Sequence, residues 1–277
     1  MRSLNEPLVS NGYTLAMTSE RLGWLEPRTA NLPMEQLRET YHQQGYLWLK
    51  GFFKRDMVLK FRDFFFETIA ERGLQAYFEI ITSREYEEFC TMPHLWNFYK
   101  EFLQGPPYLH RRKMLRFNIP GEDHCTGGHY DLIYLRSGTD RLCTSWIPLD
   151  DIPVEMGGLI YLEHSDAAGR QLEAEFRAKN AELPSEERIS AYNRNMRANG
   201  WVSTNLAEMA ERFNTRWLVA DYEAGDMVIH SPYMIHAATL NNDPLLRTRL
   251  STDIRFQCVD DEIDQRWAKD WSLGDDL

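Results

Sequence analysis

Apolar residues recur at a spacing of three and four positions in the first part of the chain, and this spacing is typical of amphipathic helices. The pattern occurs in three segments, at about 34–45, 55–73 and 84–104. The first two segments end in glycine, as helices often do. Between them, the aromatic run GYLWLKGFF predicts a strand. Proline and glycine are frequent before residue 34, so we expect an irregular lead-in there.

From residue 114 the pattern changes to short runs rich in Ile, Leu, Tyr and Trp. The runs are MLRFNI, HYDLIYLR, CTSWIPLDDI, GGLIYLEHS, RWLVADYEAGDMVIHSPYMIHAATL and RTRLSTDIRFQ. Several short strands separated by turn residues predict a β-sandwich or barrel. A polar, helical stretch at about 166–216 interrupts them. We therefore predict one mainly β domain over 1–277 with flanking helices, in which 166–216 is a helical insertion that serves either as a lid or as packing on the sheet.

The last predicted strand, RTRLSTDIRF, has two different faces. Alternation places Leu250, Ile254 and Phe256 on one face. The opposite face is polar and carries Arg247, Arg249, Ser251, Asp253 and Arg255. The apolar face is expected to lie against helices. The polar face then belongs either to a solvated edge strand or to the interior of the β-sandwich, where a buried arginine requires an anion such as a dicarboxylate.

Composition excludes several classes of protein. The chain has 277 residues, of which 43% are hydrophobic, and this is enough to form a sizeable core. Its net charge of −11 argues against a nucleic-acid partner. The four cysteines are scattered and suggest neither disulfides nor a thiolate zinc site. No signal peptide or membrane span is evident, so we expect a cytoplasmic protein without a membrane partner. The oligomeric state stays open, a homodimer included.

The stretch GGHYDLIYL offers a pair of metal ligands. If it is a strand, His129 and Asp131 project from the same face, which suits two ligands of one ion. A second histidine would complete the triad of two histidines and one carboxylate that binds Fe(II) and leaves positions open. Three histidines lie downstream as candidates: His164, His230 and His236.

Several segments together resemble one known family. They are GGHYD (127–131), GDMVIHSPYMIHAATLNN (225–242), RTRLS (247–251) and the N-terminal LRETYHQQGYLWLKGFF. Over about 37–256 the chain resembles the phytanoyl-CoA dioxygenase (PhyH) family of Fe(II)- and 2-oxoglutarate-dependent oxygenases. This resemblance implies a double-stranded β-helix, which is a cupin-like jelly roll, with helices supporting one side.

The resemblance also implies roles for particular residues. His129, Asp131 and His236 take the places of the iron ligands. Arg247, eleven residues after His236, takes the place of the arginine that binds the distal carboxylate of 2-oxoglutarate. Arg249 shares its strand face and stays a rival for this role.

Further residues are implied around the co-substrate. Trp146 is expected to form a wall of its pocket, with Thr144 on the same face. Ala238 stands where relatives commonly carry a serine that helps to hold 2-oxoglutarate, and Ser251, Thr144 or Thr239 is the expected substitute.

The activity that the resemblance implies is oxygenation. Dioxygen and 2-oxoglutarate would be consumed. Because many relatives act on natural products, we expect hydroxylation of an unactivated C–H bond of a small-molecule metabolite in natural-product biosynthesis, while desaturation or ring rearrangement stays open. From the acidic composition we expect a neutral or hydrophobic substrate. Two alternatives stay open: a β-sandwich binding protein with a vestigial metal site, and a non-oxidative metal enzyme on a cupin-like fold.

Overall fold

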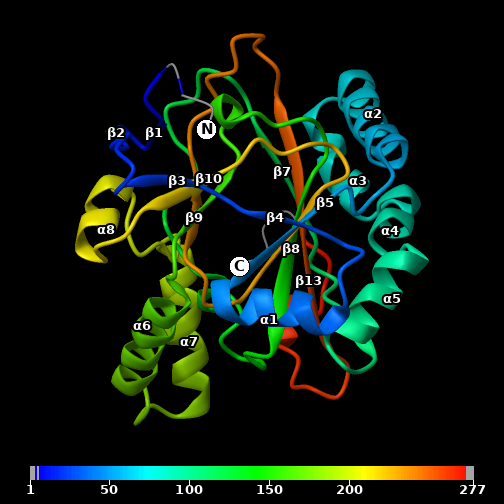
Figure 1. The fold of residues 1–277 in the computed structure, drawn as a ribbon. Coiled ribbons are helices and arrows are strands. Elements are labelled where there is room, and N and C mark those ends of the chain that lie inside the picture. The colour runs from blue at the N-terminus through cyan, green and yellow to red at the C-terminus, as the bar shows by residue number, and fades with distance from the viewer. Residues whose placement is uncertain (1–3, 5, 273–277) are drawn as a thin grey trace.

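Two β-sheets packed face to face form the centre of the molecule (Figure 1). The computed structural model describes residue 4 and residues 6–272. The larger sheet has the order β4-β5-β11-β8-β13-β6, and β7 also pairs with β13. Its strands are β4 (Pro27–Thr29), β5 (Tyr46–Lys50), β11 (Met227–His230), β8 (Leu142–Pro148), β13 (Arg249–Cys258), β6 (Pro107–Leu109) and β7 (Met114–Asn118).

The smaller sheet has the order β12-β9-β10-β3. Its strands are β12 (His236–Ala238), β9 (Leu159–Leu162), β10 (Trp217–Val219) and β3 (Leu22–Trp24). Most neighbours in both sheets are antiparallel; β4 and β3, which come from the lead-in, add parallel edges. A separate hairpin joins β1 (Val9–Ser10) and β2 (Tyr13–Thr14). The predicted mainly β fold is confirmed, and it is a jelly roll.

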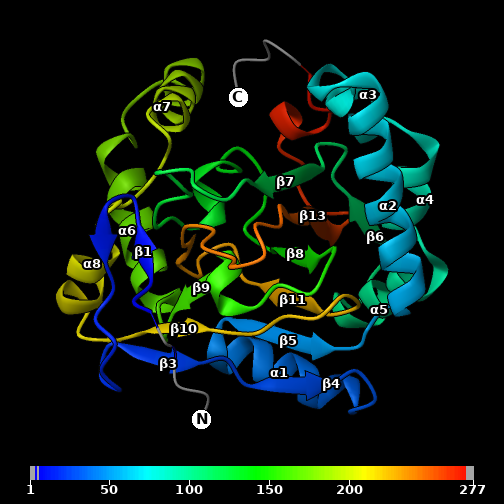
Figure 2. The same ribbon diagram turned by 90° about the horizontal axis from the view of Figure 1, so that it is seen from above.

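Five helices cover the outer face of the larger sheet (Figure 2). They are α1 (Met34–Gln44), α2 (Arg55–Arg72), α3 (Tyr77–Ile81), α4 (Arg84–Cys90) and α5 (Pro93–Phe102). The helix predicted at 84–104 is thus two helices, because Pro93 begins a new one. Aromatic contacts join helix to sheet; for example, Tyr99 of α5 stacks on Phe256 of β13 with ring centres 3.9 Å apart.

Three helices lie between β9 and β10 in the sequence, on the opposite side of the molecule from α2–α5 (Figure 2). They are α6 (Asp166–Lys179), α7 (Ser185–Arg197) and α8 (Leu206–Arg212). Leu206 and Met209 of α8 join a buried cluster with Trp217 of β10 and Ile160 of β9. Part of this insertion therefore packs on the outer face of the smaller sheet. Among the described residues, no helix has the length and apolar character needed to cross a membrane.

Strand β13 lies inside the larger sheet, with β8 on one side and β6 and β7 on the other. Its apolar face belongs to the core beneath the helices, as the alternation predicts. Its polar face points between the sheets, where Arg255 is 2% exposed. The interpretation as a solvated edge strand is therefore wrong. The strand begins at Arg249, so Arg247 lies in the preceding loop.

The strand predicted at 127–135 is not regular. Gly128 and His129 each form a single β-bridge, and a 3₁₀ turn, η2 (Asp131–Ile133), follows. Three further 3₁₀ turns are η1 (Leu74–Ala76), η3 (Val154–Met156) and η4 (Gln265–Trp267). Tyr130 and Leu132 nevertheless point into the core under the insertion, as the alternation predicted, while His129 and Asp131 point between the sheets.

Candidate metal centre

The backbones of His129 and His236 hold each other in register. The His129 amide donates to the His236 carbonyl over 3.0 Å, and the His236 amide donates back over 2.9 Å. His236 begins β12, so the short bridge fixes the loop that carries His129 and Asp131 to the smaller sheet. The centres of the two imidazole rings lie 4.2 Å apart.

The position of the proton on each imidazole follows from its partner. His129 Nδ1 lies 2.9 Å from the Gly127 carbonyl, and His236 Nδ1 lies 2.9 Å from the Met234 carbonyl. A carbonyl oxygen can only accept, so each Nδ1 carries the hydrogen and each Nε2 keeps its lone pair. Both lone pairs are then available to a metal.

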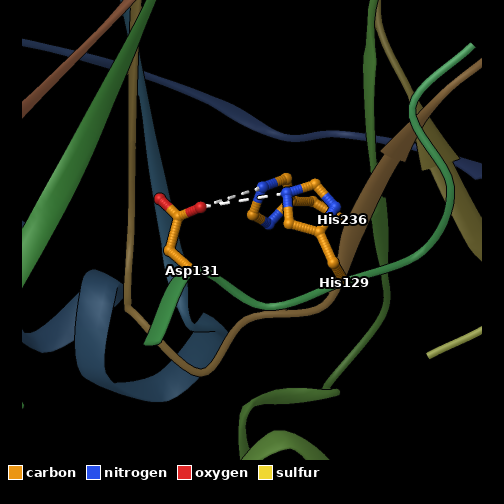
Figure 3. Close-up of side chains that lie close together, drawn as sticks. All are labelled: His129, Asp131 and His236. Atoms are coloured by element: carbon orange, nitrogen blue, oxygen red, sulfur yellow. Dashed lines mark ion pairs between the residues drawn. The ribbon is translucent and has the colours of Figure 1, made fainter. Parts of the chain in front are cut away.

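Asp131 faces the two imidazoles with one carboxylate oxygen (Figure 3). Its Oδ1 lies 3.8 Å from His129 Nε2 and 3.6 Å from His236 Nε2. One ligand atom from each of these three residues lies within 4.8 Å of the others, and all three residues are buried. Two imidazoles and one carboxylate are a donor set suited to Fe(II), with positions left for other ligands. The three residues therefore fit an iron ion.

The other carboxylate oxygen of Asp131, Oδ2, is held by the protein. The Thr144 hydroxyl donates to it, Arg255 Nη2 donates over 3.2 Å, and His230 Nε2 lies 3.4 Å away. His230 is in turn fixed through Nδ1, 2.7 Å from the Tyr161 hydroxyl. These contacts orient Asp131 so that Oδ1 points at the imidazoles.

Burial and charge set the protonation of the site. Burial lowers the pKa of His129 to about 4, and it lowers that of His236 well below its usual range. Burial alone would raise the pKa of Asp131, but Arg255 and the neighbouring histidines outweigh it and hold that pKa well below normal. The site at neutral pH is therefore two neutral imidazoles and one carboxylate.

Two glycines let the ligand loop pass close to the insertion. A Cβ on Gly128 would lie 2.5 Å from Met209 Sδ of α8, and one on Gly127 would lie 2.8 Å from the Trp201 ring. A larger residue at either position would require the Met209 or Trp201 side chain, or the loop itself, to shift. The GG before His129 therefore has a packing reason of its own.

Helix α6 also holds this loop. Tyr130, which stands between the two ligands, donates its hydroxyl hydrogen to Glu173 Oε2 over 3.0 Å. Arg136 Nε donates to the same oxygen over 2.8 Å, and the side chains of Arg136 and Glu173 are both 2% exposed. We name Tyr130, Arg136 and Glu173 the loop anchor. A buried, hydrogen-bonded ion pair of this kind ties the insertion firmly to the loop.

A cavity of about 20 Å³ adjoins the three candidate ligands. Trp146, Thr144 and Ala238 line it. Thr144, however, is engaged with Asp131. Ser251 is buried on the inward face of β13 but does not line the cavity, and its hydroxyl has no partner. Thr239 is likewise buried with an unpartnered hydroxyl.

The two rival arginines lie in different surroundings. Arg247 is outside the cavity; its side chain is 36% exposed and makes a two-bond ion pair with Asp243. Arg249 lines the cavity at 3% exposure. Its hydrogen-bond acceptors are neutral, the Gly157 carbonyl at 2.7 Å and the Asn118 side-chain oxygen at 3.1 Å, and its Nε has no partner. The structure thus brings Arg249, not Arg247, to the site.

Arg249 fits an acidic ligand. Burial, with Arg116 nearby, lowers the pKa of Arg249 to about 10, so the group is still a cation at neutral pH. A buried guanidinium without a carboxylate in direct contact is costly unless an anion binds to it. The cavity has room for about one water molecule. A molecule the size of 2-oxoglutarate therefore requires the lining side chains to move.

Sequence reasoning missed several contributors to the site. It gave no role to Arg255, although the alternation of β13 placed it on the inward face. It did not connect Tyr161 and His230 with Asp131. Arg116, on the inward face of β7, also lines the cavity and forms an ion pair with Asp253. Only pairing across strands reveals these partners.

The fold and this donor set are those of the non-haem iron oxygenases with a facial triad. The family model for phytanoyl-CoA dioxygenase (PhyH) matches residues 41–247, which is more than half of the chain. The chain belongs to the phytanoyl-CoA dioxygenase family. It is therefore an Fe(II)- and 2-oxoglutarate-dependent oxygenase by family, and Fe(II), 2-oxoglutarate and dioxygen are its cofactor and co-substrates. No curated protein gives a significant match to the sequence.

Solved structures with this fold include SnoK and SnoN and EctD from S. alaskensis. The carbocyclase SnoK from nogalamycin biosynthesis has a TM-score of 0.60 at 18% identity, covering 86% of this chain and 89% of SnoK. The epimerase SnoN, solved with Fe³⁺, α-ketoglutarate and nogalamycin RO, has a TM-score of 0.58 at 18% identity, covering 81% and 83%. EctD from S. alaskensis, solved with 2-oxoglutarate and 5-hydroxyectoine, has a TM-score of 0.59 at 14% identity, covering 91% and 88%. At these identities the likeness concerns the fold.

Proposed function

We propose that this protein hydroxylates an unactivated C–H bond of a small-molecule metabolite, with iron held by His129, Asp131 and His236. The observation that carries the proposal is the convergence of two Nε2 lone pairs and one carboxylate oxygen at the inner wall of the jelly roll. Iron with 2-oxoglutarate and dioxygen supplies an oxidant strong enough to remove hydrogen from such a bond.

Arg249 is the group that we assign to the distal carboxylate of 2-oxoglutarate. Support comes from its burial, its neutral hydrogen-bond partners and its unpartnered Nε. Arg247 has the spacing that the family resemblance implies, but its guanidinium is already paired with Asp243. The buried hydroxyl of Thr239 is one candidate to replace the serine that Ala238 lacks.

The remaining residues keep the site in its working form. Thr144 and Arg255 fix Asp131 so that a single oxygen faces the metal position. The carbonyls of Gly127 and Met234 keep the proton on Nδ1 of each histidine. Buried walls, Trp146 among them, exclude water from the place where the reaction occurs.

The substrate is proposed to be a mid-sized natural product or related metabolite. SnoN was solved with nogalamycin RO and EctD with 5-hydroxyectoine, and both are small molecules. The neighbours also include an epimerase and a carbocyclase, so hydroxylation is one of several outcomes open to this fold. We further propose that the insertion clamps the ligand loop through the loop anchor, instead of opening and closing as a lid.

Oxygen labelling tests the proposal. Iron-loaded protein is supplied with 2-oxoglutarate, a panel of metabolites and ¹⁸O₂, and the products are examined by mass spectrometry. Succinate formation together with a substrate that gains one labelled oxygen is the expected result, and His129→Ala should give neither. Oxidation without label in the product would replace hydroxylation with desaturation or rearrangement. No oxygen-dependent succinate at all would favour a vestigial site or a non-oxidative enzyme.

A further inference from the structure

A second cavity, of about 370 Å³, lies beside strand β7. Unlike the metal cavity, its wall is rich in apolar and aromatic side chains. Five of these are Leu74, Tyr77, Phe78, Phe117 and Trp271. We call this cavity the aromatic vestibule. Its volume falls within the range of small-molecule sites.

The vestibule adjoins the metal cavity. Three residues, Arg116, Thr126 and Arg249, line both cavities. Strand β7 pairs with β13 but with no other strand in the described part of the chain, so it forms an edge of the larger sheet. The vestibule therefore meets the metal cavity at this edge of the sheet. The boundary between the two cavities is formed by side chains and not by another strand of the described chain.

The rings of the vestibule suit a flat or apolar body. Trp271 meets both Tyr77 and Phe78 edge-on, with ring centres 5.8 Å apart in each case, and Tyr77 meets Phe117 at 6.1 Å. Leu74 is 59% exposed. Aromatic walls of this kind gain most from burying another ring or an alkyl chain.

The inner end of the vestibule is positively charged. The lining of the metal cavity contains three guanidiniums and two carboxylates. The guanidiniums belong to Arg116, Arg249 and Arg255, and the carboxylates belong to Asp131 and Asp253. One positive charge is therefore in excess when the imidazoles are neutral. Fe(II) and the dianion of 2-oxoglutarate add no net charge, so the excess persists in the loaded site. Buried cations of this kind favour an anionic ligand.

Arg116 is the cation placed to meet such a ligand. Its Nε donates to Asp253, yet its side chain keeps 32% of its surface exposed, far more than Arg249 or Arg255. It lines the vestibule and, together with His129 and Asp131, the metal cavity. A group bound at Arg116 therefore lies at the junction of the two cavities.

We infer that the substrate is a carboxylic acid with an apolar, ring-sized body, which lies in the aromatic vestibule while its carboxylate binds Arg116. The inference depends on the proposed function only in calling the ligand a substrate. It keeps the hydrophobic body expected from the composition and adds one negative charge, because the charge at this junction is opposite in sign to that of the whole chain.

A pair of dyes tests the binding site without iron or turnover. 8-Anilinonaphthalene-1-sulfonate and N-phenyl-1-naphthylamine share an aromatic body, and only the first carries an anionic group. Both fluoresce on entering an apolar site, so their dissociation constants can be measured on metal-free protein. We expect one saturable site that prefers the sulfonate, and about a tenfold weaker affinity for the sulfonate in Arg116→Gln with little change for the neutral dye.

Exposed Leu74 provides variants that do not disturb the Arg116–Asp253 pair. Leu74→Glu should weaken binding of the sulfonate, and Leu74→Lys should strengthen it. Lys60→Gln on α2 is the control: it lowers the net charge by one, as Leu74→Glu does, and should leave binding of the sulfonate unchanged. An affinity for the sulfonate that is the same in wild type, both Leu74 variants and Arg116→Gln would overturn the inference.

Aromatic acids that displace the dye should then stimulate succinate formation more than their amides do. If the protein forms succinate but the Leu74 and Arg116 variants bind the sulfonate as the wild type does, the inferred substrate class is rejected and the proposed function is kept. If the dyes bind as expected but no succinate forms, the proposed function is rejected.

Discussion

His129 and His236 exchange two backbone hydrogen bonds, and their imidazole rings lie 4.2 Å apart. The same short bridge that closes the ligand loop onto β12 also places the two candidate metal ligands beside each other. The positions of the ligands therefore depend on backbone pairing before any metal binds. The metal site is in this sense part of the fold, and the loop anchor secures it from the other side.

Thr144 is expected to contribute to iron affinity without touching iron. Thr144→Val removes the hydroxyl that holds Asp131 Oδ2 and should weaken iron binding about 10- to 100-fold. Thr239→Val is the matched control, because the buried Thr239 hydroxyl has no partner in the structure. Competition with a chelator gives both affinities. Equal iron affinity in the two variants would show that the contact to Asp131 has no such role.

The two rival arginines can be separated by the affinity for 2-oxoglutarate. Arg249→Met should raise the dissociation constant about 10- to 150-fold, because a charge-assisted hydrogen bond contributes roughly 1.5–3 kcal/mol. Arg247→Met should change it less than about threefold, since its guanidinium is paired with Asp243 outside the cavity. Calorimetric titration of iron-loaded, anaerobic protein measures both values. A larger effect in Arg247→Met would return the role to that residue.

The insertion should behave as a clamp in hydrogen exchange. Amides of α6 are expected to be equally protected with and without iron and 2-oxoglutarate, because Glu173 ties this helix to the ligand loop. Glu173→Gln weakens the partnership with buried Arg136, so protection of both α6 and the ligand loop should fall in this variant. A large gain of protection in wild-type α6 on ligand binding would indicate a lid.

Stability of the metal-free protein should fall in mild acid. Burial lowers the pKa of His110 to about 4, while an unfolded histidine has a pKa near 6.5. The unfolded chain therefore binds more protons between these values, and the contribution of His110 is lost as the pH falls from 6.5 toward 4. Between pH 7 and pH 5 this amounts to about 2 kcal/mol. Urea unfolding of wild type and His110→Gln at both pH values checks this prediction. Between pH 7 and pH 5 the free energy of unfolding should fall by about 2 kcal/mol less in the variant than in the wild type. An equal fall in the two proteins would contradict the assignment to His110.

The sequence was most informative where alternation decides which face is buried. Alternation correctly separates the two faces of β13, with Leu250 and Ile254 on one face and Arg249 and Arg255 on the other, but it left open whether the arginines meet solvent or the interior, and the structure places them inside. The region around His129 was harder. Its alternation suggests a strand, yet Gly128 and His129 make one bridge each, to the segment before α8 and to β12, and a 3₁₀ turn follows.

The arginine assignment shows a second limit. The family resemblance implies Arg247 for this role, but Asp243 pairs with that side chain in the loop, and β13 begins two residues later. Only the three-dimensional course of the loop decides which guanidinium enters the cavity. The contacts of Asp131 with Arg255 and His230 likewise join distant strands, so no local pattern could identify them.

The most direct test of the central claim is an anaerobic optical titration. Fe(II) and then 2-oxoglutarate are added to the metal-free protein, and the visible charge-transfer band of a keto acid chelated to iron is recorded, with Asp131→Ala as control. We predict a band that saturates at one equivalent of iron per chain and is lost in the control. Folded, iron-binding protein that gives no band, or a band unaffected in Asp131→Ala, would contradict it.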